Sequence, residues 1–241
     1  KTPMVKSSVT YVIFDVYGTV VDWRSSVIAE AQALGERKGI KGVDWEAFTD
    51  AWKAAYRPSM DEVNAGRRPW TTNDVLQRQR LDVIAGEFGL QGLSEADKDG
   101  LNRAWHRLAP WPDANPGLLR IKAKHPIGTF SNGSFHLLAN MARHAGLPWD
   151  FIISADNFRR YKPAPEIYLG AIELLGGEAE RILLVAAHNY DLAQARKHGI
   201  KTAYVCRKTM FGPNQDRDLE AEDDWDIVTD SIEGAADALC V

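Results

Sequence analysis

Short, uninterrupted runs of apolar residues recur along the chain in the manner of buried strands. The first run, residues 9–14, is rich in β-branched and aromatic side chains, which suits a strand buried on both faces of a parallel sheet. Similar runs predict five further strands, at residues 126–130, 151–153, 182–186, 201–206 and 226–228. Helical patterns alternate with them at residues 136–146, 165–177 and 191–199, the last two ending in glycine. This alternation predicts an α/β fold with a doubly wound, Rossmann-like parallel sheet.

The stretch between the first two predicted strands, residues 15–125, is far longer than an ordinary crossover and has no strong strand pattern. It contains segments that favour helices, at residues 27–39, 45–66, 72–89 and 94–108. We therefore expect a helical cap domain at residues 23–113, inserted into a core formed by residues 1–22 and 114–241. Ligands bind beyond the carboxyl ends of the strands in such sheets, so this cap would cover the site and exclude water.

Polar residues follow the predicted strands at the points where each run ends. Asp15 comes directly after the first run, in FDVYGT, and a carboxylate there could attack carbon to form an ester intermediate. Ser131 and Asn132 follow the second run, in FSNGS, where small donors suit a carboxylate or a halide. The alternatives are a helix-capping aspartate and an ordinary turn, since Ser, Asn and Gly dominate turns.

Two further polar elements lie later in the chain. Lys162 precedes Pro163, which can open the next helix, so its ammonium could be a fixed charge above a carboxylate. The strand at residues 182–186 runs into HNYD, which contains His188 and Asp191. Asp191 could instead be an N-cap worth about 1 kcal/mol, and His188 a loop histidine. Four polar clusters after successive strands favour one shared site.

The composition narrows the class of protein. Of the 241 residues, 45% are hydrophobic and 26% are charged, which excludes disorder and fits one large domain or one domain with an inserted lobe. The net charge of −4 is mild and no basic stripe is present, so nucleic acid is not an expected partner and small molecules are. We interpret the acidic segment at residues 214–226 as a solvated surface loop.

Cysteine usage and hydropathy indicate the compartment. Cys206 and Cys240 lie far apart in sequence, which argues against a disulfide framework and favours a cytoplasmic location. No window reaches the roughly 20 apolar residues that a membrane-spanning helix needs. The methionine at position 4 leads us to expect that residues 1–3 are not native sequence and that the protein is unprocessed.

In this order and context, Asp15, Ser131, Lys162 and Asp191 resemble the four signature motifs of the haloacid dehalogenase superfamily over essentially the whole chain. Most members of that superfamily are magnesium-dependent phosphatases with a second aspartate two residues after the nucleophile. Here that position is Tyr17. The acidic fourth motif of the phosphatases, typically beginning Gly-Asp, is also replaced, by Ala-Ala-His at residues 186–188. Two hard-cation features are therefore missing, and we expect neither a metal nor another cofactor.

The departures from the phosphatase pattern match the L-2-haloacid dehalogenases, whose motifs resemble FD-x-YGT and SNG. The resemblance implies hydrolysis of short-chain 2-haloacids to 2-hydroxyacids through an ester on Asp15, with fluoroacetate among the candidate substrates. It implies that Ser131 binds the substrate carboxylate, Asn132 faces the halide, and Lys162 steadies Asp15 and the oxyanion of the second step. It also implies that Asp191 orients or activates water, Thr19 hydrogen-bonds near the nucleophile, and Tyr17 lines the pocket. We expect Tyr190 to line the pocket too, because it lies within the fourth motif. The resemblance also suggests a homodimer.

Two positions depart from the dehalogenase pattern. His188 stands where these enzymes commonly have asparagine, and it could polarise water or donate to a small, strongly hydrated leaving group. The Trp-Arg pair expected in the cap, whose arginine receives halide, appears as Trp52 and Lys53, and Arg57 one helical turn later is a competing candidate. A solvated helix is the alternative for both cations.

Three other functions stay open on the sequence. His188 also resembles the related cis-epoxysuccinate hydrolases, which open an epoxide through an aspartyl ester. A magnesium-dependent small-molecule phosphatase is the second alternative, and a catalytically silent small-molecule binder is the third.

Overall fold

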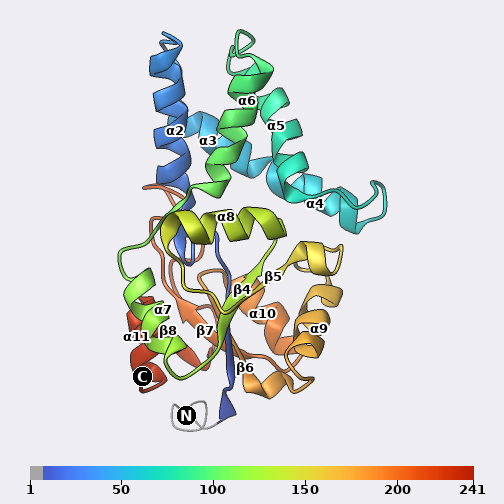
Figure 1. The fold of residues 1–241 in the computed structure, drawn as a ribbon, viewed down its shortest axis with the longest axis vertical. Coiled ribbons are helices and arrows are strands. Elements are labelled where there is room, and N and C mark those ends of the chain that lie inside the picture. The colour runs from blue at the N-terminus through green and yellow to red at the C-terminus, as the bar shows by residue number, and fades with distance from the viewer. Residues whose placement is uncertain (1–7) are drawn as a thin grey trace.

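Residues 8–241 are described by the computed structural model, and they contain one large parallel sheet (Figure 1). Its six strands lie in the order β5-β4-β1-β6-β7-β8. Their bounds are β1 (Tyr11–Phe14), β4 (Ile127–Ser131), β5 (Phe151–Ser154), β6 (Ile182–Ala186), β7 (Lys201–Val205) and β8 (Ile227–Thr229). All six predicted strands are confirmed. The expectations about residues 1–7, including those drawn from the methionine at position 4, lie outside the described residues.

Helices cover both faces of the sheet, because alternate residues of each strand point in opposite directions. Val12 and Phe14 face a core that includes residues of α7 (Ala114–Lys122), α8 (Phe135–Ala145) and α11 (Ile232–Ala238). Ile13 faces the opposite core, which includes residues of α9 (Pro165–Leu174) and α10 (Asn189–Lys197). Figure 1 shows the two groups of helices on either side of the sheet. The doubly wound arrangement is confirmed, whereas α7 and α11 had no predicted counterpart.

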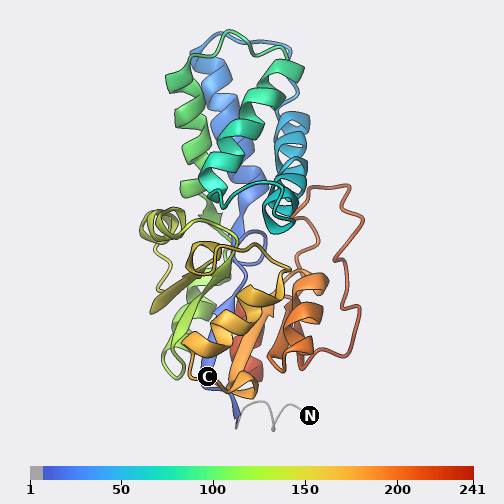
Figure 2. The ribbon, with the colours of Figure 1, turned by 90° about the vertical axis from the view of Figure 1, so that its right-hand side faces the viewer.

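The remaining helices form a second lobe above the carboxyl ends of the strands (Figures 1 and 2). They are α2 (Trp23–Arg37), α3 (Trp45–Ala54), α4 (Tyr56–Asn64), α5 (Asn73–Glu87), α6 (Glu95–Asn102) and the 3-10 helix η1 (Arg103–His106). Each helical segment expected there is confirmed, although residues 45–66 form two helices that are interrupted at Ala55. This lobe corresponds to the inserted helical cap that the sequence predicts.

Two very short strands join the lobes. β2 (Val21–Asp22) and β3 (Ala109–Pro110) pair in antiparallel fashion, and neither had a sequence pattern because each has only two residues. We propose that residues 1–22 and 114–241 form the catalytic core and residues 23–113 the cap, with this ribbon as the junction. The other 3-10 helices, η2 (Ala155–Asn157) and η3 (Ala179–Arg181), lie in the core.

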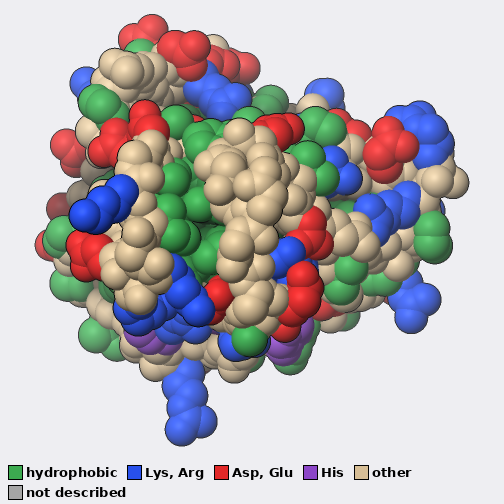
Figure 3. All heavy atoms as spheres, turned by 90° about the horizontal axis from the view of Figure 1, so that it is seen from above, with side chains coloured by type: hydrophobic (Ala, Val, Ile, Leu, Met, Phe, Trp, Pro, Cys, Tyr) green, Lys and Arg blue, Asp and Glu red, His purple; other side chains and the backbone are tan. Residues whose placement is uncertain are grey.

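Charges of both signs are mixed over the cap end of the molecule, which Figure 3 shows from above. Arg78 of the cap illustrates this mixing, since its guanidinium contacts Asp82 at 2.6 Å and Asp99 at 2.8 Å. Exposed pairs of this kind contribute little to stability individually. Among residues 8–241, no helix is both long enough and apolar enough to cross a membrane.

Candidate active site

The carboxyl ends of β1, β4 and β6 bring the signature residues together. Lys162, from the loop before α9, is buried, and its Nζ lies 3.3 Å from Asp15 Oδ1 and 2.6 Å from Asp191 Oδ2. Asp15 directly follows β1, whereas Asp191 lies in the first turn of α10 after β6. The structure therefore brings these three residues together, as the sequence predicts. A single ammonium group bridges two buried carboxylates.

Asp15 is held as a carboxylate. Thr19 Oγ1 donates to Asp15 Oδ2 at 2.7 Å, and His188 Nε2 lies 3.3 Å from the same oxygen. Burial alone would raise the pKa of Asp15, but the charges of Lys162 and His188 and the hydrogen bonds from His188 and Thr19 lower it below its usual range. A buried, ionised carboxylate of this kind keeps a lone pair available for attack on carbon.

A sharp turn after β1 places these groups. Gly18 has φ of +83°, a conformation that residues with a side chain rarely adopt. Its backbone N–H donates to the carbonyl of Val21, which closes the turn, and a Cβ at Gly18 would lie 2.8 Å from Met210 Sδ and 3.5 Å from His188 Nε2. The glycine therefore serves both the backbone conformation and the close approach of His188.

His188 is surrounded by acceptors on both ring nitrogens. Its Nε2 faces the Tyr17 carbonyl at 2.9 Å and Asp15 Oδ2, while Nδ1 faces Asp218 Oδ2 at 3.5 Å. Burial would lower the pKa of His188, but the charge of Asp15 and the hydrogen bonds to Asp15, Asp218 and Tyr17 raise it to about 10. The imidazole is therefore a cation at neutral pH, with a proton on each nitrogen.

Asp218 corrects our interpretation of the acidic segment at residues 214–226. The segment is not only a solvated loop: Asp218 is half-buried beside His188, and its Oδ1 accepts from the backbone N–H and the side-chain amide of Asn189. Trp225 of the same segment is buried and donates to Asn189 Oδ1 at 2.9 Å. No local signal separates Asp218 from the other acidic residues, because the tertiary fold of the loop creates this contact.

Asp191 is saturated by protein contacts. Its second oxygen, Oδ1, accepts from the hydroxyl of Tyr168 at 2.7 Å, and burial raises the pKa of Asp191. The N-cap of α10 is His188, so the alternative of Asp191 as an N-cap is wrong. Tyr168 was not among the predicted site residues, because its position on α9 follows an ordinary apolar helix pattern. Together these contacts fix Asp191 as the partner of Lys162.

Ser131 and Asn132 form the wall next to Lys162. Asn132 Oδ1 accepts from the backbone N–H of Lys162 at 2.7 Å, and Ser131 Oγ accepts from the backbone N–H of Gly133 at 3.1 Å. The ordinary turn that was the alternative interpretation of these residues is therefore present, but it lies within the candidate site. Tyr17 points its hydroxyl at this turn, 3.1 Å from where a Cβ on Gly133 would lie. That hydroxyl is buried without a protein partner.

The cap contributes both candidate cations. Lys53 Nζ lies 4.5 Å from the ring centre of Tyr56 and 5.3 Å from those of Tyr17 and Trp23, and burial lowers the pKa of Lys53 to about 8. Arg57 instead donates from Nη1 to the Lys162 carbonyl at 2.7 Å, and its guanidinium stacks over Tyr190 at 5.3 Å. Neither Lys53 nor Arg57 is therefore a solvated helix residue, which was the alternative interpretation.

Further hydrogen bonds close the cap on the core. Asn64 and Tyr161 exchange two hydrogen bonds, of 2.8 and 2.9 Å, and the hydroxyl of Tyr161 donates to the Thr71 carbonyl at 2.6 Å. Asn73 donates to the Asn132 carbonyl at 3.0 Å. The loops that carry Lys162 and Asn132 are therefore held by cap residues that the sequence did not identify.

The residues around Asp15 do not fit a magnesium ion. Asp15 and Asp191 are the carboxylates nearest to Lys162, and its ammonium already occupies the space between them. His188 adds a second cation against Asp15. Mg²⁺ prefers oxygen ligands in near-octahedral geometry, whereas this site offers ammonium and imidazole donors.

Comparisons with known proteins agree with this geometry. The family model of haloacid dehalogenase-like hydrolases matches residues 9–205. The structure resembles that of an L-2-haloacid dehalogenase that is 45% identical, with a TM-score of 0.93 over 96% of this chain and 99% of that one. A defluorinating L-2-haloacid dehalogenase is 42% identical, with a TM-score of 0.94 over 97% of this chain and 96% of that one.

A third similar structure contains a covalently bound acid. It is the L-2-haloacid dehalogenase of Xanthobacter autotrophicus with chloropropionic acid covalently bound, 25% identical with a TM-score of 0.79. The likeness covers 96% of this chain and 98% of that one. The matched family model and the shared fold together establish that this chain belongs to the haloacid dehalogenase-like hydrolases.

Proposed function

We propose that this protein hydrolyses short-chain L-2-haloacids to 2-hydroxyacids, with Asp15 as a covalent nucleophile. The observation that carries the proposal is the buried, ionised carboxylate of Asp15 between Lys162 and His188. The covalently bound chloropropionic acid in the Xanthobacter autotrophicus relative supports the same route.

In the first step a carboxylate oxygen of Asp15 forms a bond to carbon 2 of the substrate, and the carbon–halogen bond breaks with release of halide. The aromatic rings around Lys53 supply a partly desolvated cation, so we assign halide reception to Lys53. Arg57 is occupied by the Lys162 carbonyl and is assigned to positioning that loop and, with Tyr190, to lining the entrance. We assign Asn132, whose Oδ1 accepts from the backbone N–H of Lys162, to the side of the pocket that faces the halide.

The substrate carboxylate needs donors opposite Lys53. The hydroxyl of Ser131 accepts from the Gly133 N–H and keeps its own hydrogen for donation, and the unpaired hydroxyl of Tyr17 points at the same turn. A buried hydroxyl without a partner costs about 1–3 kcal/mol, which a bound carboxylate would relieve. We therefore assign Ser131, its turn and Tyr17 to substrate binding.

The second step requires a base for water, and ester formation itself creates one. The charge of Asp15 is the largest of the interactions that raise the pKa of His188. That charge disappears when Asp15 becomes an ester, so His188 releases its proton to solvent more readily. The neutral imidazole then takes a proton from the water that attacks the carboxyl carbon of Asp15.

Collapse of the resulting tetrahedral intermediate breaks the bond between that carbon and the substrate oxygen. The leaving alkoxide takes the proton of the new carboxyl group, which returns Asp15 to a carboxylate and His188 to a cation. Lys162 lies within reach of the oxyanion, and Thr19 holds Asp15 Oδ2 throughout. Both oxygens of Asp191 are engaged, so we assign Asp191 to orienting Lys162 and not to binding water directly.

His188 gives two alternatives a specific basis. As a cation next to Asp15, it can donate to fluoride, and a defluorinating relative is 42% identical, so fluoroacetate is a candidate substrate. The same proton could go to the oxygen of an opening epoxide ring, which is the cis-epoxysuccinate hydrolase alternative. Both reactions pass through an ester on Asp15.

A single turnover in ¹⁸O-labelled water tests the proposal. With enzyme in excess over 2-chloropropionate, we expect the label to enter Asp15 first, detected by mass spectrometry of the peptide that contains it. Label found only in the product would overturn the ester route. The Asp15→Asn variant should release no halide, and chelator-sensitive release of phosphate from an aryl phosphate would support the phosphatase alternative instead.

Location and assembly are further proposals. Cys206 and Cys240 are both free, which supports a reducing, cytoplasmic compartment. We also propose a homodimer, by analogy with the family resemblance, and light scattering coupled to gel filtration tests it directly.

A further inference from the structure

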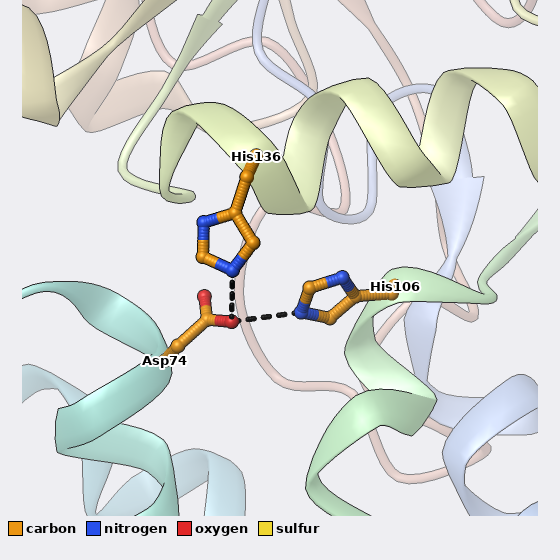
Figure 4. Close-up of side chains that lie close together, drawn as sticks. All are labelled: Asp74, His106 and His136. Carbon is orange, nitrogen blue, oxygen red and sulfur yellow. Dashed lines mark hydrogen bonds and ion pairs between the residues drawn. The ribbon is translucent and has the colours of Figure 1, made fainter.

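Three potential metal ligands meet where the cap contacts the core, outside the residues assigned to the haloacid reaction (Figure 4). Asp74 lies in the first turn of the cap helix α5, His106 ends η1, and His136 lies on the core helix α8. Asp74 Oδ2 lies 2.7 Å from His106 Nε2 and 3.1 Å from His136 Nε2. The three potential ligand atoms all lie within 4.8 Å of one another.

The surroundings orient each side chain toward this meeting point. Ser134 donates to the other oxygen of Asp74, so Oδ2 remains for the two imidazoles. His106 Nδ1 contacts the side-chain amide of Asn140 at 3.1 Å, and His136 Nδ1 contacts Ser134 Oγ at 3.4 Å. Metal-binding histidines donate a hydrogen bond from the ring nitrogen that does not bind the metal, as His136 does to Ser134. His106 Nδ1 accepts from the Asn140 amide instead, so metal binding there requires this amide to flip and present its Oδ1 to Nδ1–H.

Hydrogen-bond directions around His136 call for a cation between its Nε2 and Asp74. The hydroxyl of Ser134 has one hydrogen, which it donates to Asp74, so its oxygen accepts from Nδ1–H of His136. In the neutral imidazole with hydrogen on Nδ1, Nε2 points a lone pair at Asp74 Oδ2. Two facing lone pairs repel, and either a proton or a metal ion placed between them removes that repulsion.

We propose that Asp74, His106 and His136 bind a divalent transition metal ion such as Zn²⁺. Two imidazoles and one carboxylate are ligands that Zn²⁺ accepts, with a water molecule in the fourth position. That position opens toward a cavity of about 320 Å³, which the three residues line together with Asp99, Asn102, Arg103 and Asn140. Zn–N bonds of about 2.0–2.1 Å require only a small separation of the carboxylate from the imidazoles.

The proposed ion would link the two lobes. Asp74 and His106 come from the cap and His136 from the core, so binding can stabilise only the arrangement in which the cap is closed. The adjacent Asn73 donates to the Asn132 carbonyl, which places the ion one residue away from a contact with the substrate-binding turn. The role of the proposed ion is therefore structural, and the proposal does not depend on which haloacid is hydrolysed.

Direct binding measurements test the site. The protein is stripped with EDTA, freed of chelator and titrated with ZnCl₂ by calorimetry, with the bound metal counted by mass spectrometry after gel filtration. We expect one equivalent to be retained and the melting temperature to rise with Zn²⁺ concentration. Co²⁺ in its place should give the visible absorption of a tetrahedral site.

Two variants of histidines on the same helix distinguish Zn²⁺ binding at this site from unspecific Zn²⁺ binding elsewhere on the protein. His136→Gln should weaken Zn²⁺ binding at least tenfold and abolish the rise in melting temperature. The fold should stay intact, because the side chain of His136 is exposed. His144→Gln removes another exposed histidine of α8 and should bind like the parent. Absence of Zn²⁺ binding in the parent, or equal binding in His136→Gln, would overturn the proposal and leave the cluster as an ion pair only.

Discussion

Asp218 Oδ2 faces His188 Nδ1 at 3.5 Å, on the side of the imidazole opposite to Asp15. The histidine thus lies between two carboxylates, one that the proposed reaction consumes and regenerates and one that stays charged throughout. Asp218 contributes to the raised pKa of His188 and keeps the ring oriented toward Asp15. It is a positioning residue, because it contacts the nucleophile only through the histidine.

The first prediction concerns Asp218→Asn. The asparagine keeps Oδ1 as an acceptor for Asn189 but removes the charge beside Nδ1, so the pKa of His188 should fall from about 10 by one unit or more. NMR titration of the imidazole, assigned with a His188→Asn sample, measures this directly. Asp216→Asn removes an exposed charge of the same loop and should leave the titration unchanged. An unshifted His188 in Asp218→Asn would contradict the assignment.

The second prediction concerns Lys53, whose pKa is lowered to about 8 by burial. If its ammonium receives halide, kcat/KM should decline as pH rises through about 8, because the cation is lost. In Lys53→Arg that decline should move to higher pH, since guanidinium stays charged throughout this range. If kcat/KM of Lys53→Arg still declines near pH 8, the decline reflects the titration of a group other than Lys53.

Variants without a cation distinguish Lys53 from Arg57. Lys53→Met should reduce the rate of the first halide release by about 10²–10³, as expected when one stabilising charge is removed from a transition state. Arg57→Met should mainly raise KM, because Arg57 holds the Lys162 loop. The opposite pattern in rapid-mixing experiments would exchange the two assignments.

The third prediction compares leaving groups in His188→Asn. Fluoride is strongly hydrated, so its departure benefits from a group that transfers a proton to it. The amide of asparagine cannot transfer a proton. The first-turnover release of fluoride from fluoroacetate should therefore fall by about 10² or more, and release of chloride from chloroacetate by less than about tenfold. Halide electrodes measure both under single-turnover conditions. An equal loss with both acids would show that His188 does not discriminate between halides.

The fourth prediction uses two glycines with similar backbone conformations. Gly18 has φ of +83° and Gly42 has φ of +76°, but a Cβ meets Met210 and His188 only at Gly18, while nothing lies within 4 Å at Gly42. Gly42→Ala should cost about 1–2 kcal/mol of unfolding free energy with unchanged kcat. Gly18→Ala should cost more and also lower kcat, as measured by urea denaturation and steady-state kinetics. Equal behaviour of the two variants would mean that the close approach to His188 is unimportant.

The sheet could be predicted because its strands are buried on both faces. Runs such as residues 182–186 must be apolar throughout, and this pattern is visible without any tertiary information. Asp15 and Lys162 could be predicted because each follows such a run or is fixed by a neighbouring proline. By contrast, β2 and β3 have two residues each, too few for any periodicity.

The residues that the sequence did not reveal share a different property. Asp218 reaches His188 from an acidic loop, and Tyr168 reaches Asp191 from a helix whose pattern indicates only core packing. Asp74 and His136 meet across the boundary between cap and core. Each of these contacts depends on how distant elements pack together, and a local pattern contains no information about such packing.

The β2–β3 ribbon has a consequence for protein engineering. Val21 pairs with Pro110 and Asp22 pairs with Ala109, so the chain leaves the core and returns to it through adjacent strands. A helical lobe from another member of the family could therefore be grafted between these four residues without moving the ends of the sheet. Such chimeras would exchange Lys53, the proposed halide-receiving cation, while keeping Asp15 and His188, so their halide preference would separate the contribution of the cap from that of His188.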